Sequence, residues 1–322
     1  MKRGVLALPL MVAAVVGLSS CASSGQLNSG SGNSGAASAS GSGSASGSAS
    51  AGGSDSIDKI LADAPVASSI PSGTLMAKIK SAGVLKVGGT DAGPVFSIKD
   101  PVTGKLTGFD ADLSKMLAKY IIGQPNTALT ITTVATREAL LQNGTVDAVF
   151  ATYTITPARA QKVDFAGPYY ESGDSILVKD GSSISSVGDL NGKTVATESN
   201  STAVTAIKKY APQAKVQLFA DDNSCVQAVQ QGRVDAYVLD QGILLGDATK
   251  NPGLKVVGKP FTVEPYGIGV PKQDPQMKPF VNDWLTKIEQ AGLWTRLYNQ
   301  TIGKVVTGPA PTPPKIGSAQ GS

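Results

Sequence analysis

Hydrophobic and polar positions follow two periodicities from about residue 70 onward. Short apolar runs typical of buried strands alternate with segments whose apolar residues recur at spacings of three and four, as on one face of a helix. Strands alternating with helices predict an α/β fold of mostly parallel sheets joined by right-handed crossovers. The expected strands are 85–90, 128–134, 146–151, 175–179, 194–197, 215–219, 234–239, 254–257 and 266–270, and the expected helices are 108–120, 136–142, 202–210, 225–230 and 276–298 with a break at Gly292.

One tract occurs twice, as QNGTVDAV at 142–149 and as QQGRVDAY at 230–237. In each copy the glycine is typical of a helix end, and the Val-Asp-Ala run begins a short buried strand. The chain therefore contains two similar α/β units. Segments after the second unit lack its pattern, which indicates that the chain returns to the first. We expect lobe 1 to contain 70–173 and 266–304, lobe 2 to contain 174–265, and hinge crossings near 171–175 and 261–266 beside an interlobe cleft.

The two ends of the chain lack this pattern. Residues 1–20 have a basic start and a short apolar run, as in a secretory signal, and their Leu-Ser-Ser-Cys ending resembles a bacterial lipobox, which makes Cys21 a lipid anchor. Residues 21–56 are mostly Gly, Ser and Ala, a composition that predicts a disordered tether with a reach of roughly 30 Å. The Pro-rich segment 305–322 is also expected to be disordered, without packing.

Composition excludes several kinds of chemistry. Removing Lys2 and Arg3 from the 28 basic residues leaves 26 against 24 acidic ones, so no basic surface indicates nucleic-acid binding. The absence of His excludes catalytic triads and zinc sites that need it. With Cys21 lipidated, Cys225 is the only other thiol, which excludes an intramolecular disulfide and Cys-rich metal sites. We therefore expect neither a metal nor a cofactor.

Polar residues follow both copies of the repeated tract, at the strand ends where open α/β sheets bind ligands. Thr152 and Thr154 are two residues apart, so their hydroxyls are expected to point the same way. Thr156-Pro157 is typical of a helix start and places Arg159 in the first turn, where a bound carboxylate would offset the unfavourable helix dipole. A solvated arginine is an equally good interpretation of the pattern alone.

The second copy is followed by Asp240, which could accept a hydrogen bond from an ammonium group or simply cap the next helix. Ser201 and Thr202 open another helix and are either caps or ligand donors. Read together, Arg159 and Asp240 describe the two charged ends of an α-amino acid.

These motifs resemble bacterial family 3 solute-binding proteins, the polar amino-acid receptors of ABC importers. The similarity spans about residues 70–303 and includes GFDADL at 108–113 and TITPAR at 154–159. It implies a two-lobed, type II periplasmic-binding-protein-like fold in which Arg159 binds the ligand carboxylate and Asp240 the ammonium. It further implies that Thr202 is a second-lobe donor and that Asp91 is a ligand or cleft-rim carboxylate.

Within that family, ATYTI at 151–155, SCVQAV at 224–229 and YGIGV at 266–270 resemble the actinobacterial glutamate-binding branch. Arg137 matches a basic position that receptors for acidic amino acids use for the side-chain carboxylate, although a solvated first-turn residue is the alternative. Relatives of this branch often pair the cysteine at the position of Cys225, but Ala196 stands at the partner's place, so Cys225 is expected to be unpaired. Thr90 replaces a second basic residue, which weakens the prediction of a strictly acidic ligand.

The leading hypothesis is an amino-acid-binding lipoprotein of an ABC importer at the outer face of the cytoplasmic membrane. It is expected to be a monomer that closes its lobes around glutamate or aspartate, with glutamine or asparagine next, and to deliver the ligand to the permease subunits. A sensor that signals to a membrane partner would use the same residues. An enzyme of this fold, a cyclic-amino-acid dehydratase, would need a general acid in the cleft, for which Glu171 and Glu198 are the candidates.

Overall fold

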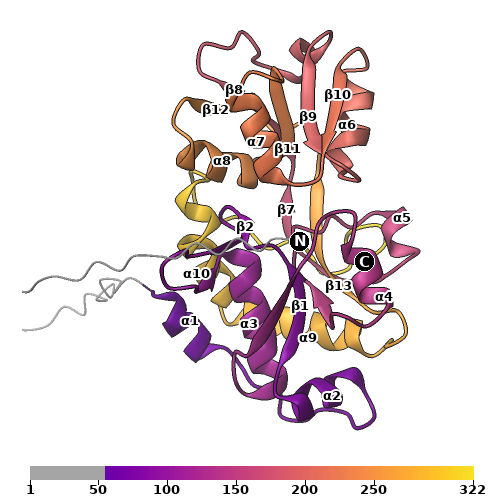
Figure 1. The fold of residues 1–322 in the computed structure, drawn as a ribbon. Helices are drawn as coiled ribbons and strands as arrows, with labels where there is room; N and C mark the ends of the chain where they lie inside the picture. Colours follow the sequence, from indigo (N-terminus) through magenta and orange to yellow (C-terminus); the bar gives the residue numbers. More distant parts are fainter. Residues whose placement is uncertain (1–54) are drawn as a thin grey trace, which may run out of the picture. The chain divides into compact units, whose positions relative to one another are not determined.

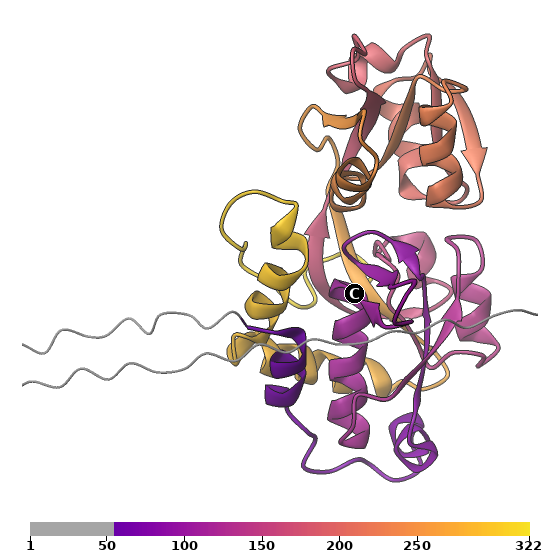
Figure 2. The same ribbon diagram turned by 60° about the vertical axis from the view of Figure 1, so that its left-hand side comes forward.

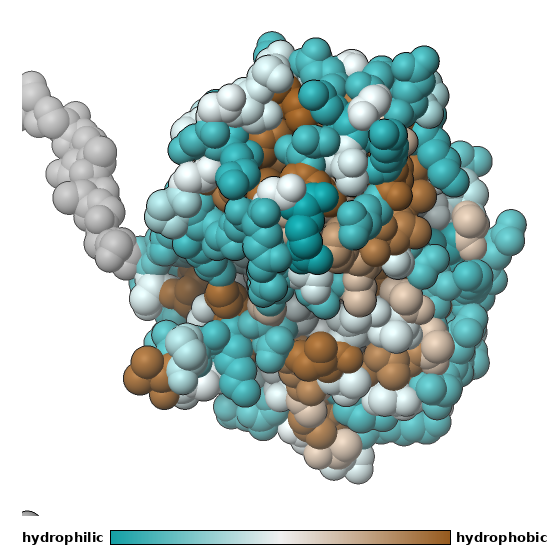
Figure 3. Space-filling view, turned by 45° about the horizontal axis from the view of Figure 1, so that its top comes forward, coloured by the Kyte–Doolittle hydropathy of each residue, from teal (hydrophilic) through white to brown (hydrophobic). Residues whose placement is uncertain are grey.

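The structure is a computed structural model that describes residues 55–322, and it places them in two lobes (Figure 1). The predicted signal, Cys21 and nearly all of the predicted tether lie outside the described residues. None of the helices within 55–322 is long and apolar enough to cross a membrane. The face shown in Figure 3 is largely hydrophilic, and its hydrophobic residues gather in patches rather than spreading evenly.

Each lobe is built on a five-stranded mixed sheet of the same strand pattern. In lobe 1, β1 pairs in parallel with β5 and β6, whereas β13 is antiparallel to β6 and β7. The predicted α/β fold is confirmed, but one strand of each sheet runs antiparallel to its neighbours, namely β13 in lobe 1 and β8 (Asp174–Lys179) in lobe 2. The order in lobe 1 is β5 (Thr127–Ile131), β1 (Leu85–Gly89), β6 (Ala148–Val149), β13 (Glu264–Val270) and β7 (Asp164–Ser172).

Lobe 2 repeats this arrangement, with β9 parallel to β10 and β11, and β8 antiparallel to β11 and β12. The order is β10 (Lys215–Phe219), β9 (Thr194–Glu198), β11 (Ala236–Asp240), β8 (Asp174–Lys179) and β12 (Leu254–Val257). Its helices are α6 (Thr202–Tyr210), α7 (Asp222–Gln230), α8 (Gln241–Lys250) and the 3-10 helix η1 (Val187–Leu190). The helices of lobe 1 are α1 (Ile57–Asp63), α2 (Leu75–Ala82), α3 (Phe109–Ile122), α4 (Arg137–Gln142), α5 (Pro157–Ala160), α9 (Met277–Gln290), α10 (Leu293–Gln300) and the 3-10 helix η2 (Ile302–Lys304).

The repeated tract has the same structural role in both lobes. Gly144 and Gly232 follow α4 and α7 with φ of 73° and 70°, the left-handed conformation that ends a helix. Asp147 accepts a hydrogen bond from the backbone N–H of Lys86 at 2.9 Å, and Asp235 accepts one from Thr194 at 2.8 Å. Each aspartate therefore joins the start of its own strand to the start of a neighbouring strand. The candidate ligand-binding residues lie after the other end of the strand.

Several elements of lobe 1 were not expected from the sequence, among them helices α1 and α2, a small sheet and strand β7. The small sheet β2 (Ala92–Gly93), β3 (Ser97–Lys99) and β4 (Leu106–Thr107) consists of pieces too short to show a period, and it carries Phe96. Strand β7 contains Gly167 and Pro168, residues that normally interrupt a strand pattern. Its pairing with β13 holds it in the sheet, although its own sequence does not predict a strand.

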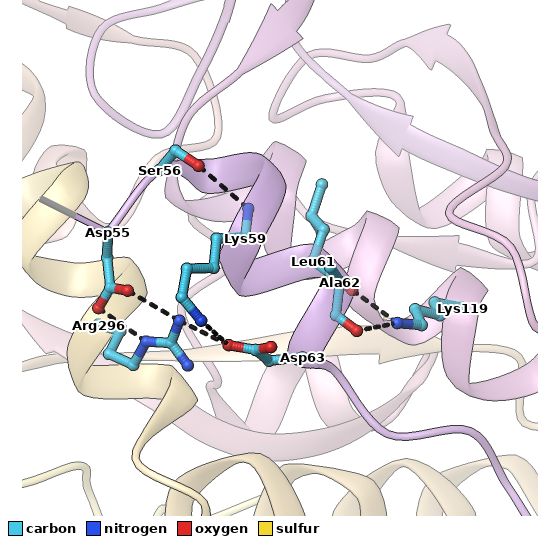
Figure 4. Close-up of polar contacts among 8 residues, drawn as sticks. All are labelled: Asp55, Ser56, Lys59, Leu61, Ala62, Asp63, Lys119 and Arg296. Atoms are coloured by element: carbon cyan, nitrogen blue, oxygen red, sulfur yellow. Dashed lines mark hydrogen bonds and ion pairs between the residues drawn. The ribbon is translucent and has the colours of Figure 1, made fainter. Parts of the chain in front are cut away.

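The N-terminal helix α1 packs against lobe 1 beside α10 and α3 (Figure 2). Figure 4 shows Arg296 of α10 held between two carboxylates, with Nε and Nη2 bonded to Asp55 at 2.8 and 2.9 Å and Nη2 lying 2.8 Å from Asp63. Lys119 of α3 donates to the carbonyl oxygens of Leu61 and Ala62, and Ile60 is fully buried. Ordered structure thus begins inside the segment 21–56 that was expected to be a tether.

The C-terminal segment 305–322 packs against lobe 1, which corrects the expectation that it is disordered. Ile316 contacts the main hydrophobic core and Ala319 contacts a second cluster, while the N–H of Gly317 donates to the carbonyl of Gly167 at 2.8 Å. The end of the segment reaches α5, since a Cβ atom placed on Gly321 would lie 2.8 Å from that of Ala160. The few apolar residues of this segment pack against the surface of lobe 1.

The chain crosses between the lobes twice, from β7 through Gly173 to β8 and back into β13 (Figure 1). The crossings touch, because the N–H of Asp174 donates to the hydroxyl of Thr262 at 2.8 Å. A Cβ atom on Gly173 would overlap the carbonyl oxygen of Thr262 and lie 2.9 Å from Cβ of Pro260. Only glycine therefore fits at this crossing without moving the other strand.

Candidate functional site

A cavity of about 120 Å³ lies between the lobes, at the carboxyl ends of the parallel strands of both sheets. This is the position at which open α/β sheets bind ligands. Six of the seven residues predicted from the sequence line it, and the seventh, Asp91, does not, although its neighbours Thr90 and Ala92 do. The six are Arg137, Thr152, Thr154, Arg159, Thr202 and Asp240.

Arg159 is fixed by the local fold of α5. Thr156 caps this helix by accepting a hydrogen bond from the backbone N–H of Arg159 at 3.2 Å, and Pro157 follows at the first helical position, as the sequence predicts. The guanidinium is 9% exposed and donates to the carbonyl oxygens of Thr154 at 2.8 Å and of Asn200, in lobe 2, at 3.1 Å. Arg159 is therefore a buried cation that contacts both lobes rather than a solvated side chain.

Arg137 lies at the start of α4 and is 4% exposed. Its guanidinium stacks 3.8 Å above the ring of Tyr153 and donates one hydrogen bond, to the carbonyl oxygen of Ala151 at 2.8 Å, which leaves Nε without a partner. Burial, reinforced by the charge of Arg159, lowers the pKa of Arg137 to about 9. Neither arginine belongs to any ion pair within residues 55–322.

Thr152 and Thr154 follow the end of β6 rather than continuing it. Thr152 has φ of 43°, so the alternation of side chains expected for a strand is broken there. Its N–H donates to Oδ2 of Asp110 at 2.7 Å, and the hydroxyl of Tyr169 donates to Oδ1 of the same carboxyl at 2.7 Å. Asp110, at the start of α3, thus holds the turn in place, and burial raises its pKa to about 6.

Asp240 ends β11 in lobe 2 and is 6% exposed. Although it precedes α8, its side chain makes no capping hydrogen bond, and Oδ1 has no partner among the described residues. Burial raises the pKa of Asp240, and the neighbouring Glu264 carboxyl acts in the same direction. The alternative role as a helix cap is therefore not the one that the structure gives to Asp240.

The N-terminus of α6 faces the same cavity through Ser201 and Thr202. Ser201 is the N-cap residue, but its side chain forms no capping bond and instead lies 3.2 Å from the hydroxyl of Thr197. The first backbone N–H groups of α6 are therefore uncapped by a side chain. An uncapped helix N-terminus attracts an anion.

Lobe 2 also contributes acidic residues that were not assigned to ligand binding from the sequence. Glu198, at the end of β9, lines the cavity, and burial together with the charge of Asp222 raises its pKa to about 8. Asp222 lines the cavity beside it and accepts a hydrogen bond from the hydroxyl of Tyr237 at 2.9 Å. The sequence contains one indication that Glu198 belongs to the site: it lies at the end of a predicted strand, as the other candidates do.

Phe96 is the aromatic wall of the site. It is 1% exposed, lines the cavity, and packs edge-on against Tyr266 at 5.7 Å between ring centroids. No period in the sequence indicates it, because it lies in a loop of the small sheet. Within residues 55–322, no group of three or more acidic or Cys side chains is arranged to hold a metal ion.

The cavity can therefore hold a molecule that carries both charges. Arg137, Arg159 and the start of α6 attract negative groups, whereas Asp240 and Glu198 accept hydrogen bonds from positive or neutral donors.

A family model described as "Bacterial extracellular solute-binding proteins, family 3" matches residues 85–304. The chain is 40% identical over 210 residues to the ABC transporter glutamine-binding protein GlnH of Bacillus subtilis, covering 65% of this chain and 77% of that protein. It is 32% identical over 243 residues to the glutamate-binding protein GluB of Corynebacterium efficiens, covering 71% and 82%.

Among solved structures, an ancestral arginine-binding protein bound to glutamine matches with a TM-score of 0.65 and 38% identity. The match covers 69% of this chain and 98% of that one. Helix α1 and the segment 305–322 lie outside the residues that the family model matches.

Proposed function

The chain belongs to the bacterial extracellular solute-binding proteins of family 3, and we propose that its ligand is a polar amino acid with an amide side chain, glutamine first. As a member of this family it is an extracytoplasmic amino-acid-binding protein of an ABC transporter and not an enzyme. The observation that carries the proposal is a pair of buried arginines in the same cavity as Asp240: within residues 55–322 neither arginine has an ion-pair partner, and Oδ1 of Asp240 has no hydrogen-bond partner.

The α-carboxylate is assigned to Arg159 and the start of α6. Arg159 is buried, and a charge-assisted hydrogen bond contributes roughly 1.5 to 3 kcal/mol. Ser201 leaves the first N–H groups of α6 uncapped, so lobe 2 supplies donors to the same carboxylate. Thr202, at the first position of α6, is the donor that we expect from that lobe.

The α-ammonium is assigned to Asp240, with Thr152 and Thr154 opposite it in lobe 1. Oδ1 of Asp240 is buried and without a partner, which is costly unless a donor fills the place. Two charge-assisted hydrogen bonds, one at each charged end of the ligand, contribute roughly 3 to 6 kcal/mol, so the further donors and apolar contacts of the cavity must supply the rest of the roughly 8 kcal/mol that micromolar affinity requires. Each lobe then binds one charged end of the ligand, and closure brings both into contact with it.

The ligand's side chain is assigned to the space between Arg137 and Glu198. Arg137 and Glu198 line the same cavity, and they lie close enough that the positive charge of Arg137 lowers the pKa of Glu198 and opposes the effect of burial. A side-chain amide matches such a pair, because its oxygen accepts from Arg137 and its NH2 donates to Glu198. Glutamate would place a second carboxylate beside Glu198, which fits only while Glu198 keeps its proton, whereas an amide fits both charge states of Glu198. Glutamine is therefore placed before glutamate, whereas the positive charge of Arg137, taken alone, favours glutamate.

A thermal-shift screen of the twenty amino acids tests the proposal, because a ligand that binds only the folded state raises the melting temperature. We expect glutamine to give the largest shift, followed by asparagine and glutamate. A largest shift with arginine or lysine would mean that Glu198 and Asp222 dominate the side-chain site. No shift with any amino acid would contradict the assignment of the cavity itself.

We also propose that Cys21 anchors the protein to the membrane by a lipid. The Leu-Ser-Ser-Cys sequence supports this, although it lies outside the described residues. A Cys21→Ser variant is expected to leave the membrane fraction while retaining ligand affinity. Membrane retention of that variant would contradict lipidation at Cys21.

A further inference from the structure

Three buried carboxyl groups meet where the chain crosses between the lobes. Asp240, the last residue of β11, is the direct antiparallel partner of Asp174, the first residue of β8. Glu264 begins β13 and is paired with Ser172, two residues before Asp174. The exposed fractions of Asp174, Asp240 and Glu264 are 0%, 6% and 5%. Asp174, Asp240 and Glu264 are called the hinge cluster below.

The hinge cluster contains more acceptors than the described residues satisfy. Within residues 55–322, both carboxyl oxygens of Asp174, Oδ1 of Asp240 and Oε2 of Glu264 have no hydrogen-bond partner. No Lys or Arg within residues 55–322 forms an ion pair with any of the three. Unpaired buried charges cost several kcal/mol each, and like charges opposite one another on paired strands repel.

Such a cluster lowers its cost by holding protons. Burial raises the pKa of Asp174, the charge of Asp240 adds to that rise, and Asp240 is raised into the neutral range by burial and by Glu264. Other groups act on Asp240 as well: Tyr266 on β13 and Arg159 on α5 favour its charged form. Glu198 on β9 and Tyr169 and Tyr170 on β7 lie close enough to feel its charge. The single positive charge of Arg159 cannot neutralise three ionised carboxyl groups.

We propose that Asp174 makes amino-acid binding proton-linked: the hinge cluster holds a proton in the free protein and releases it when the ligand's ammonium occupies the site at Asp240. The O–H bond of one carboxyl breaks, its proton goes to the buffer, and the ammonium supplies the positive charge in its place. Asp174 is a positioning residue, since it acts on the ligand through Asp240. The inference rests on the proposed ammonium site.

The direction of the pH effect follows from this exchange. At acidic pH the cluster is protonated and the ammonium must displace the proton, so affinity falls. As pH rises through the neutral range the free protein loses this proton, and the gain in affinity levels off until the ligand's own α-ammonium begins to lose its proton. Each proton released on binding changes Kd by about tenfold per pH unit in the range where it is bound.

The test is calorimetry of L-glutamine binding at about pH 7 in phosphate and in Tris, whose ionisation enthalpies differ strongly. We expect the two heats to differ by the amount that corresponds to about one released proton. L-glutamate replaces glutamine if glutamine gives no heat, because every α-amino acid carries the ammonium. Equal heats in both buffers at pH 7 overturn the inference while leaving ligand binding intact. An absence of heat with any amino acid contradicts the proposed function instead.

Two variants assign the proton to the hinge cluster. Asp174→Asn removes one of the two paired acids that share the proton, so proton release at pH 7 should fall clearly below that of the unmodified protein while binding persists, although burial and Glu264 still raise the pKa of Asp240. Asp180→Asn, an exposed carboxylate just after the far end of β8, should release as many protons as the unmodified protein. Unchanged release by Asp174→Asn overturns the role of Asp174. If that variant does not fold, the slope of log Kd against pH in the unmodified protein decides, and a flat profile between about pH 6 and 8 overturns the proposal.

Discussion

At the scale of single residues, two buried guanidinium groups determine what the cavity can bind. Arg137 and Arg159 are both shielded from water, and their mutual repulsion adds to the cost of burial, as the lowered pKa of Arg137 indicates. A ligand carboxylate would offset part of that cost. Because burial reduces screening by solvent, each arginine should contribute more to the free energy of ligand binding than an exposed arginine would.

Replacing Arg159 by Ala should weaken amino-acid binding by about 2 to 5 kcal/mol, because the ligand carboxylate would stay buried without its partner. Isothermal calorimetry measures the change. Lys162→Ala is the matched control, since this exposed cation lies just after the same helix and pairs with Glu138 instead of lining the cavity. Equal affinities of the two variants would show that Arg159 does not bind the carboxylate.

Glu198 is predicted to set the choice between an amide and a carboxylate. Its raised pKa of about 8 means that the folded protein loses stability as pH rises through that value, because the buried charged form is penalised. Glu198→Gln removes this loss and the repulsion of an acidic ligand. The preference for glutamine over glutamate should narrow by about tenfold, as read from the ratio of their Kd values at about pH 8.5. A ratio that does not move would place the side chain elsewhere.

Carboxylates also show how far sequence reasoning reaches at this scale. Asp147, Asp235 and Asp240 all lie beside predicted strands, but the first two bond to backbone N–H groups of neighbouring strands and only Asp240 has a free oxygen in the cavity. The pattern predicted their position relative to the strands. It could not predict which carboxylates find partners, because those partners come from segments distant in sequence.

At the scale of elements, the ends of the chain differ most from expectation. Composition predicts that a segment cannot fold by itself, and the segment 305–322 has few apolar residues. It nevertheless packs, because Val306, Ala310 and Ile316 lie on a core that the rest of lobe 1 has already formed. Helix α1 is ordered in the same way, through Ile60 and the contacts of Arg296. The sequence pattern within these two segments does not show that distant parts of the chain provide a surface on which they pack.

Arg296→Ala should loosen α1 without affecting ligand binding, since Arg296 joins α10 to Asp55 and Asp63 and lies outside the cavity (Figure 4). Hydrogen exchange of residues 57–63 should become faster by a few fold, the modest size being that of partly exposed ion pairs. Arg233→Ala, an exposed residue of lobe 2, serves as control. If exchange in α1 is unchanged, burial of Ile60 alone holds the helix.

At the scale of the whole described chain, the two sheets share one strand pattern, and the antiparallel strands β7, β8 and β13 connect them. The same strands carry the hinge cluster. Motion of one lobe against the other therefore takes place beside the group that we assign to the ligand's ammonium. Ligand charge, proton release and lobe closure are expected to depend on one another for this reason.

Gly173→Ala tests the hinge at this scale. The added methyl group would overlap the carbonyl oxygen of Thr262, so the two crossings must separate, at a cost of about 1 to 3 kcal/mol in the free energy of unfolding. Separation also moves Asp174, which is bonded to Thr262, and should weaken binding and hinder closure. Urea denaturation and the ligand-induced decrease in the radius of gyration measure the two effects. Gly188→Ala is the control, because its methyl group would meet only the hydroxyl of Ser186 at 3.8 Å. If both variants are equally stable and close equally on the ligand, the crossings bend elsewhere than at Gly173.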